Sequence, residues 1–167
     1  WSDELKRLKA KYGVYGSTGN HDYGTYVRWA TREEQTNNLK QFFKNMESAG
    51  FHMLNNTNIP LVIGTDTIYL AGVENCGRPP FPCFGNLPRA LQGTEEHVVL
   101  LLSHDPSHWR DEVIRYPVAL MLAGHTHAMQ IGIQIGSFRW SPSKYVYTEY
   151  NGLYETNGRQ LYVSRGV

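Results

Sequence analysis

Two continuous apolar runs constrain the fold of this 167-residue chain more than any other feature. They are Val98–Leu102 and Val118–Leu122, and neither contains a polar residue. Such runs are typical of strands whose two faces are both covered. Strand patterns alternate with helical patterns early in the chain, and hairpin patterns dominate late. The sequence therefore predicts an α/β sandwich whose sheet combines parallel and antiparallel pairing.

Turn residues predict two hairpins on either side of these runs. Ile59–Ile63 and Thr67–Val73 are strand-like and are separated by a short polar segment that contains glycine. Gly152–Glu155 and Gln160–Val163 flank Asn157-Gly158, a pair of residues that favours a type I′ turn. Residues 129–135 alternate between apolar and small or polar side chains, which predicts a further, half-exposed strand.

One long helix is predicted before these strands. Thr31 and Glu34 form a capping box at its start, and Gly50 ends it. The side chains expected to form its buried stripe are Leu39, Phe42, Phe43 and Met46.

Three histidine-bearing loops each follow a predicted strand. They are Gly19-Asn20-His21-Asp22, Ser103-His104-Asp105-Pro106 and Gly124-His125-Thr126-His127. Open α/β sheets place ligand sites at the carboxyl ends of their strands, so the three loops are expected to meet. Gly19 and Gly124 are expected to permit backbone angles and close approach that other residues do not allow.

The side chains in these loops suit divalent metal ions. Imidazoles and amide oxygens are ligands for Mn, Fe and Zn, and His104 and Asn20 offer one of each. Residues two apart on an extended segment point the same way, so His125 and His127 are expected to face one small volume. Two metals about 3.5–4 Å apart activate water and hold phosphate oxygens, which suits attack at phosphorus.

The three loops, in this order, resemble the last three metal-site motifs of the calcineurin-like metallophosphoesterases. The segments Gly152-Leu153-Tyr154 and Leu161-Tyr162-Val163-Ser164-Arg165-Gly166 resemble the bacterial, often membrane-associated branch of phosphohydrolases. That branch often has glycine where this chain has Ala128. The resemblance implies a mixed-sheet αββα sandwich, with residues 1–167 as a single domain that forms the C-terminal portion of the phosphoesterase domain.

The resemblance also implies a role for each motif residue. Asn20, His104 and His125 would bind one divalent ion, and His127 would bind a second, with Mn, Fe or Zn as the metals. His21 would contact the phosphate and act as general acid, and Asp22 would orient its ring. The substrate would be a phosphate ester or pyrophosphate, and the membrane-associated relatives suggest a lipid-linked one.

The first two motifs of the family, Asp-x-His and Gly-Asp, do not occur before Gly19, where Asp3 is the single aspartate. We therefore expect a piece of a longer enzyme that is inactive alone. A binding or scaffold module that kept the fold and lost the chemistry is the alternative. A third reading is a metallo-β-lactamase-type hydrolase, whose His-x-His continues into Asp-His, whereas Ala128-Met129 follows here.

Charge, apolar runs and cysteines limit the kinds of partner and compartment that are expected. The net charge is +1 and no basic block is present, so nucleic acid is not indicated as a partner. No apolar run reaches the length that a bilayer requires, so a membrane association would come from a segment before Trp1. Cys76 and Cys83 would form a disulfide in an exported protein and remain thiols in the cytosol. The sequence leaves the localisation open.

Overall fold

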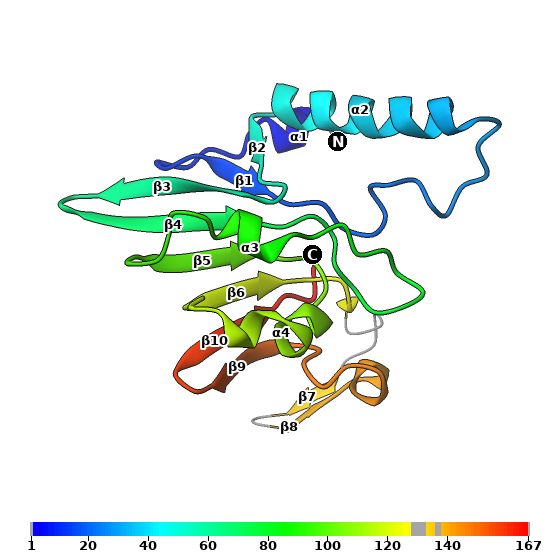
Figure 1. The fold of residues 1–167 in the computed structure, drawn as a ribbon. Coiled ribbons are helices and arrows are strands. Elements are labelled where there is room, and N and C mark those ends of the chain that lie inside the picture. The colour runs from blue at the N-terminus through cyan, green and yellow to red at the C-terminus, as the bar shows by residue number, and fades with distance from the viewer. Residues whose placement is uncertain (1, 128–132, 136–137, 167) are drawn as a thin grey trace.

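A six-stranded mixed sheet forms the centre of the computed structural model, which describes residues 2–127, 133–135 and 138–166. The strand order is β3-β4-β5-β6-β10-β9 (Figure 1). The strands are β3 (Thr57–Ile63), β4 (Asp66–Gly72), β5 (Val98–Leu102), β6 (Leu120–Ala123), β9 (Gly152–Thr156) and β10 (Arg159–Val163). Strands β4, β5, β6 and β10 are parallel, and β3 and β9 are antiparallel edge strands. The prediction of an α/β fold with a mixed sheet is confirmed.

Smaller elements surround this sheet. Strand β1 (Val14–Gly16) pairs in parallel with β2 (Phe51–Met53), and β7 (Ile133–Ile135) pairs with β8 (Phe138–Trp140). The helices are α1 (Ser2–Leu5), α2 (Arg32–Ser48), α3 (Leu87–Ala90) and α4 (Ser107–Asp111), with 3-10 turns at Val113–Arg115 and Pro142–Tyr145. Residues 129–132 of the strand predicted over 129–135 lie outside the described part, and residues 133–135 form β7. None of the described helices has the length and apolarity needed to span a bilayer.

Both predicted hairpins are present. Strand β3 pairs with β4 from Ile63 opposite Asp66, which leaves a two-residue turn between them. Asn157 and Gly158 join β9 to β10 with φ angles of 54° and 73°. Two successive residues with positive φ are what a type I′ turn requires, so that prediction is confirmed.

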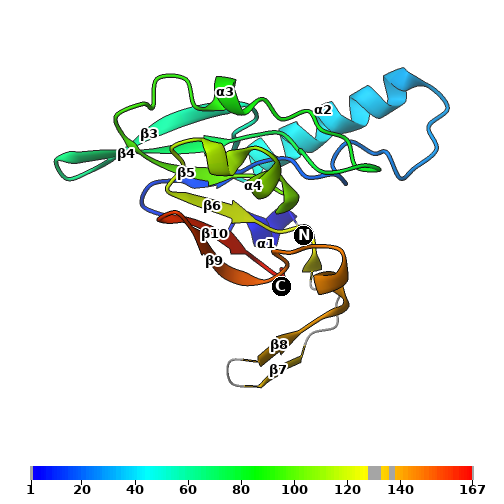
Figure 2. The same cartoon turned by 60° about the horizontal axis from the view of Figure 1, so that its bottom comes forward.

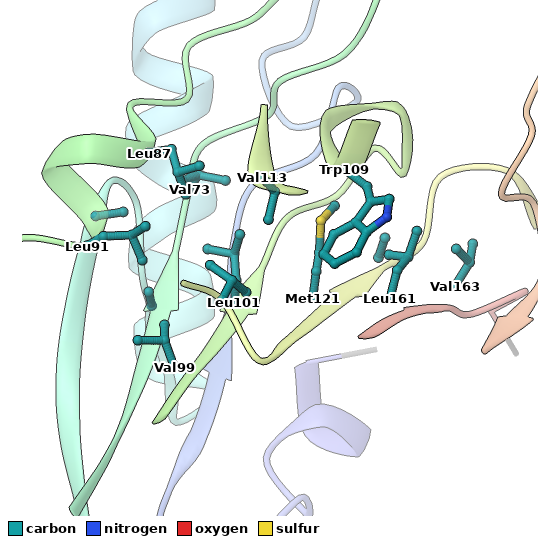
Figure 3. Packing of buried hydrophobic residues seen from close by; sticks show 14 residues of the cluster. Val73, Leu87, Leu91, Val99, Leu101, Trp109, Val113, Met121, Leu161 and Val163 are labelled. Carbon is teal, nitrogen blue, oxygen red and sulfur yellow. The ribbon is translucent and has the colours of Figure 1, made fainter. Parts of the chain in front are cut away.

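The hydrophobic core lies on one face of the sheet, under α3 and α4. Val99, Leu101, Met121 and Leu161 are fully buried on neighbouring strands. Figure 3 shows Met121 and Leu161 beside Trp109 of α4, which is 1% exposed. The alternation of side chains along each strand sends every second residue into this core.

The opposite face of the sheet is largely uncovered by the described residues. Val98, Leu122 and Tyr162 are 53%, 37% and 47% exposed. Burial therefore alternates along the two apolar runs, and the prediction that both faces of residues 98–102 and 118–122 are covered is wrong for the described part. An apolar run indicates which side chains avoid water, but the segment that covers them lies elsewhere in the protein.

The long helix α2 begins as predicted and packs differently. Thr31 Oγ1 accepts a hydrogen bond from the Glu34 N–H at 3.1 Å, and Glu34 Oε2 accepts one from the Ala30 N–H. None of the residues of α2 is fully buried. The residues of the predicted stripe, Leu39, Phe42, Phe43 and Met46, are half-buried, so the predicted face is right and its full burial is wrong. The helix contacts β2 and extends away from the six-stranded sheet (Figure 2). Helical periodicity indicates which face of a helix is apolar, but it does not indicate how completely another segment covers that face.

Candidate metal centre

The second and third histidine loops are held together by backbone hydrogen bonds at the carboxyl edge of the sheet. Strands β5 and β6 are parallel, so the loops that follow them leave the sheet at the same edge. The Ser103 N–H donates to the Leu122 carbonyl at 3.1 Å, and the Gly124 N–H donates to the His104 carbonyl at 2.9 Å. These bonds place the residues after Gly124 directly beside His104.

Three side chains, one from each loop, converge on one point. Asn20 Oδ1 lies 2.8 Å from His104 Nε2 and 3.1 Å from His125 Nδ1. The two ring nitrogens are 3.2 Å apart. Asn20 is 2% exposed, so its amide is removed from bulk water. Segments that are 21 to 105 residues apart therefore supply one cluster of donor atoms.

The spacing of these donors fits a single divalent ion. Ligands about 2.0–2.2 Å from one ion are separated from each other by roughly 2.8–3.6 Å at tetrahedral or octahedral angles. All three measured separations lie in that interval. Among the described residues, no group of three or more histidine, cysteine, aspartate or glutamate side chains is placed to hold a metal. The third donor is the amide oxygen of Asn20.

Neighbouring residues fix the first two donors. Asn20 Nδ2 donates to the Tyr26 hydroxyl at 2.6 Å, which turns Oδ1 of the same amide toward the histidines. A β-carbon at Gly19 would lie 2.8 Å from two atoms of the His104 ring, so the predicted close approach at Gly19 is confirmed. The same expectation for Gly124 is wrong, because a β-carbon there meets no atom within 4 Å and its φ is not positive.

Burial favours the neutral form of both imidazoles. Desolvation, followed by the charge of His125, lowers the pKa of His104 to about 4. Desolvation also lowers the pKa of His125, and Asp105 opposes that change. Both rings are therefore neutral at pH 7, the form in which an unprotonated ring nitrogen binds a metal.

His127 lies near enough to the converging donors for its charge to lower the pKa of His104 and of His125. The backbone at His125 and His127 has φ values of 66° and 44°, so the segment is left-handed at both positions and the predicted extended backbone is wrong. His127 is exposed, and a β-carbon at Gly166 would lie 3.0 Å from its Nδ1. Non-glycine residues seldom adopt such angles, and those that do cluster at functional sites.

The remaining residues of the first loop lie at its surface. The exposed His21 ring stacks on Tyr26 with centroids 4.5 Å apart. Asp22 Oδ2 accepts a hydrogen bond from the Gly19 N–H at 2.8 Å, which closes the loop around Asn20. Burial raises the pKa of the Asp22 carboxyl, and the Gly19 bond and the charge of His21 act against that rise.

Comparison with known proteins finds similar metallophosphoesterases. The chain is 30% identical over 170 residues to an uncharacterized metallophosphoesterase of Bacillus subtilis, YkuE, in an alignment that covers 98% of the chain and 52% of the relative. It is 29% identical over 173 residues to a transmembrane protein with metallophosphoesterase domain from Danio rerio (96% of the chain, 37% of the relative).

A further similar protein is an uncharacterized metallophosphoesterase of Helicobacter pylori, which is 27% identical over 172 residues, with 98% of the chain and 39% of the relative covered. This chain is a distant homologue of the metallophosphoesterases. The chain spans 37% to 52% of the length of these three relatives. No family model matches the chain, and no solved structure matches it.

Two residues of this chain that border the donor cluster were not predicted from the sequence as part of the site. The Tyr147 hydroxyl lies 2.8 Å from His125 Nε2, and Asp105 Oδ2 lies 3.5 Å from the same nitrogen. Asp105 belongs to the second histidine loop, and its Oδ1 accepts a hydrogen bond from the Ser107 N–H at 2.8 Å. No local signal distinguishes Tyr147 from the other tyrosines of the chain.

A disulfide-closed loop forms one wall of the cluster. Cys76 and Cys83 are joined, which decides between the two states that the sequence allowed. Within this loop the Phe81 ring meets the His125 ring edge-on, with centroids 4.7 Å apart. Burial, followed by the charge of Asp105, raises the pKa of Tyr147 to about 12. The disulfide loop of this chain therefore packs against the donor cluster.

His108, which is not one of the donors, is hydrogen-bonded on both of its ring nitrogens. Ser103 Oγ is 2.9 Å from His108 Nδ1, and His108 Nε2 is 2.9 Å from Glu112 Oε2. The order Ser-His-Glu matches that of a nucleophilic triad, but Ser103 and His108 are only 1% and 3% exposed. A substrate carbonyl has no access to Ser103, so these bonds anchor α4 to the end of β5.

Proposed function

We propose that this chain carries part of the dinuclear metal centre of a metal-dependent phosphohydrolase. The observation that carries the proposal is the convergence of Asn20 Oδ1, His104 Nε2 and His125 Nδ1 within 3.2 Å of one another. These are metal-type donors, they come from three separate strand ends, and the relatives are named metallophosphoesterases.

Each donor has a proposed part in that centre. Asn20, His104 and His125 hold one divalent ion, and His127 holds the second together with residues from outside this chain. Mn, Fe and Zn all suit imidazole and amide oxygen ligands. Ions bound there would polarise the phosphoryl oxygens and lower the pKa of a bound water. The buried neutral rings of His104 and His125 keep the first site ready, because no proton has to leave them at pH 7.

The proposed general acid is His21. Its ring is exposed, so it can reach the leaving oxygen of a bound phosphate, and stacking on Tyr26 restricts where the ring can lie. Asp22 lies close enough for the charge of His21 to lower its pKa, and this proximity supports an orienting role for Asp22. Its bond to the Gly19 N–H holds the loop that presents both side chains.

The exposed apolar face of the sheet supports the finer description of the fold. We propose that residues 1–167 form a single unit, the C-terminal portion of an αββα sandwich, and that a second sheet covers Val98, Leu122 and Tyr162. Each of these side chains is more than a third exposed, although it is large and apolar or aromatic. The relatives are longer than the part that aligns, so a further segment of the same protein is the expected source of that sheet.

Alone, the chain is expected to have no useful phosphohydrolase activity. Among the described residues, no three histidine, cysteine, aspartate or glutamate side chains are grouped so that they could hold a metal ion. That same observation favours the alternative function, a binding or scaffold module that retains the fold without the chemistry. The proposed substrate is a phosphate ester or pyrophosphate. Two relatives are named transmembrane proteins, which supports a lipid-linked substrate and membrane association of the whole protein.

Metal binding tests the proposal. The purified chain, equilibrated with Mn²⁺, Zn²⁺ or Co²⁺ and then dialysed, should retain at most one ion by elemental analysis. Asn20→Ala, His104→Ala and His125→Ala should each remove it, and His52→Ala, an exposed ring on β2, should not. Two tightly held ions per chain would contradict the half-site, and no binding above the His104→Ala level would contradict the metal centre.

Activity separates the enzyme from the scaffold. A longer form of the protein with both missing motifs should hydrolyse bis-p-nitrophenyl phosphate in the presence of Mn²⁺. His21→Ala in that form should lower turnover far more than it lowers metal content. Equal losses would make His21 a metal ligand, and a longer form that binds metal without hydrolysis would favour the scaffold.

A further inference from the structure

The ring nitrogen of His125 that faces away from the donor cluster has two partners of its own. Its Nδ1 belongs to the cluster, at 3.1 Å from Asn20 Oδ1. Its Nε2 lies 2.8 Å from the Tyr147 hydroxyl and 3.5 Å from Asp105 Oδ2. A neutral imidazole carries one proton, so the groups at Nε2 decide which nitrogen is left with a free lone pair.

Asp105 is placed so that it favours a proton on Nε2. The residue is 1% exposed, and its Oδ1 is occupied by the Ser107 N–H. Its Oδ2 is buried and has no hydrogen-bond partner among the described residues. A β-carbon at Gly77 would clash with that oxygen, so the disulfide loop closes over it and limits access of water. An unpaired buried carboxylate oxygen is costly, and an N–H at His125 Nε2 is the nearest donor that reduces the cost.

Tyr147 adds a second acceptor at the same nitrogen. Its hydroxyl oxygen can accept from Nε2–H while its own proton is free to turn toward another acceptor. The rings of Tyr147 and His125 also meet at 80° with centroids 5.6 Å apart, so the tyrosine restricts rotation of the imidazole. Phe81 meets His125 edge-on from the disulfide loop.

From these contacts we infer that Asp105 and Tyr147 are positioning residues that keep the His125 proton on Nε2 and so present the Nδ1 lone pair to the donor cluster. The inference rests on the proposed function, because it concerns the same ion site. Histidine ligands that hold a metal through one nitrogen are commonly fixed through the other, and loss of such a partner typically weakens metal binding about 10–100-fold.

The first test measures the tautomer in the metal-free chain. Histidine is labelled with ¹⁵N, and two-bond ¹H–¹⁵N correlations show which ring nitrogen of His125 carries the proton; His125→Ala identifies the signals. We expect Nε2–H in the wild-type chain, and a mixture of tautomers in Tyr147→Phe and in Asp105→Asn. A wild-type His125 protonated at Nδ1 would overturn the inference, and this result requires no bound metal.

The second test measures affinity for Co²⁺ by absorption titration. Tyr147→Phe keeps the ring and loses the hydroxyl, and Asp105→Asn keeps the oxygen that accepts from Ser107. Each should bind Co²⁺ about 10–100-fold more weakly than the wild-type chain. The control is Tyr145→Phe, a neighbouring side chain that is 75% exposed and should not change affinity. Unchanged affinity in both variants, while His125→Ala abolishes binding, would refute the positioning role. If the wild-type chain binds no Co²⁺, the proposed function fails, and the tautomer still decides the inference.

Discussion

The backbone of Gly19 lies directly against the imidazole of His104, so that a β-carbon at position 19 would sit 2.8 Å from the Cε1 and Nδ1 atoms of that ring. This contact joins the loop after β1 to the loop after β5, and it places Asn20 within 2.8 Å of His104 Nε2. The ring cannot yield without breaking its contacts to Asn20 and His125. The site therefore depends on the absence of a side chain at position 19.

Gly19→Ala is expected to displace His104 and to abolish metal binding by the chain. Overpacking of this kind costs about 1–3 kcal/mol of stability. The matched control is Gly124→Ala in the third loop, where a β-carbon meets no atom within 4 Å and the backbone has no positive φ. Binding of Zn²⁺ followed by calorimetry should separate the two variants. Equal affinities would mean that the contact at Gly19 does not position His104.

Asn56 is expected to be the largest single polar contributor to stability outside the site. Its Oδ1 accepts from the Glu74 and Asn86 N–H groups, and its Nδ2 donates to Glu74 Oε2 and to the Phe84 carbonyl. Its φ of 57° is also one that asparagine tolerates better than alanine does. Asn56→Ala should lower the free energy of unfolding in urea by about 3 kcal/mol, because buried donors lose their acceptor. The exposed Asn38→Ala on α2 should change it by less than about 0.5 kcal/mol.

Opening the disulfide should weaken the metal site as well as the fold. A loop closed across eight residues contributes roughly 2–3 kcal/mol by restricting the unfolded chain. Cys76→Ser combined with Cys83→Ser should also release Phe81 from His125, although Arg78 still bonds Asp111 of α4 at 2.7 Å. Metal affinity should fall several-fold in this variant. A loss of stability with no change in affinity would show that the loop does not support the site.

Tyr23 should make the stability of the chain fall at alkaline pH. Burial, opposed by the Thr18 hydrogen bond, raises the pKa of Tyr23 from 10.0 to about 12. The folded state holds this proton where the unfolded state releases it, so the contribution is complete below pH 10 and is lost as the pH rises through 12. In Tyr23→Phe the unfolding free energy should decline less steeply between pH 10 and 12 than in the wild-type chain. Tyr145→Phe should keep the wild-type slope.

The sequence alone determined the local elements and the chemistry of the donors. Asn157-Gly158 fixed a type I′ turn because both residues tolerate a positive φ. The capping box at Thr31 started α2 because its bonds are made within four residues. The three motifs identified Asn20, His104 and His125 as metal-type donors because the identity of a side chain sets what it can bind.

Tertiary structure decided what those side chains meet. An apolar face on α2 or along β6 is visible in the sequence, but its cover comes from a distant segment, and in the described residues Leu122 remains 37% exposed. The left-handed backbone at His125, the hydroxyl of Tyr147 and the buried oxygen of Asp105 likewise follow no local rule. Hydrogen bonds across more than 20 residues depend on where strands end in space, and only the folded sheet brings those ends together.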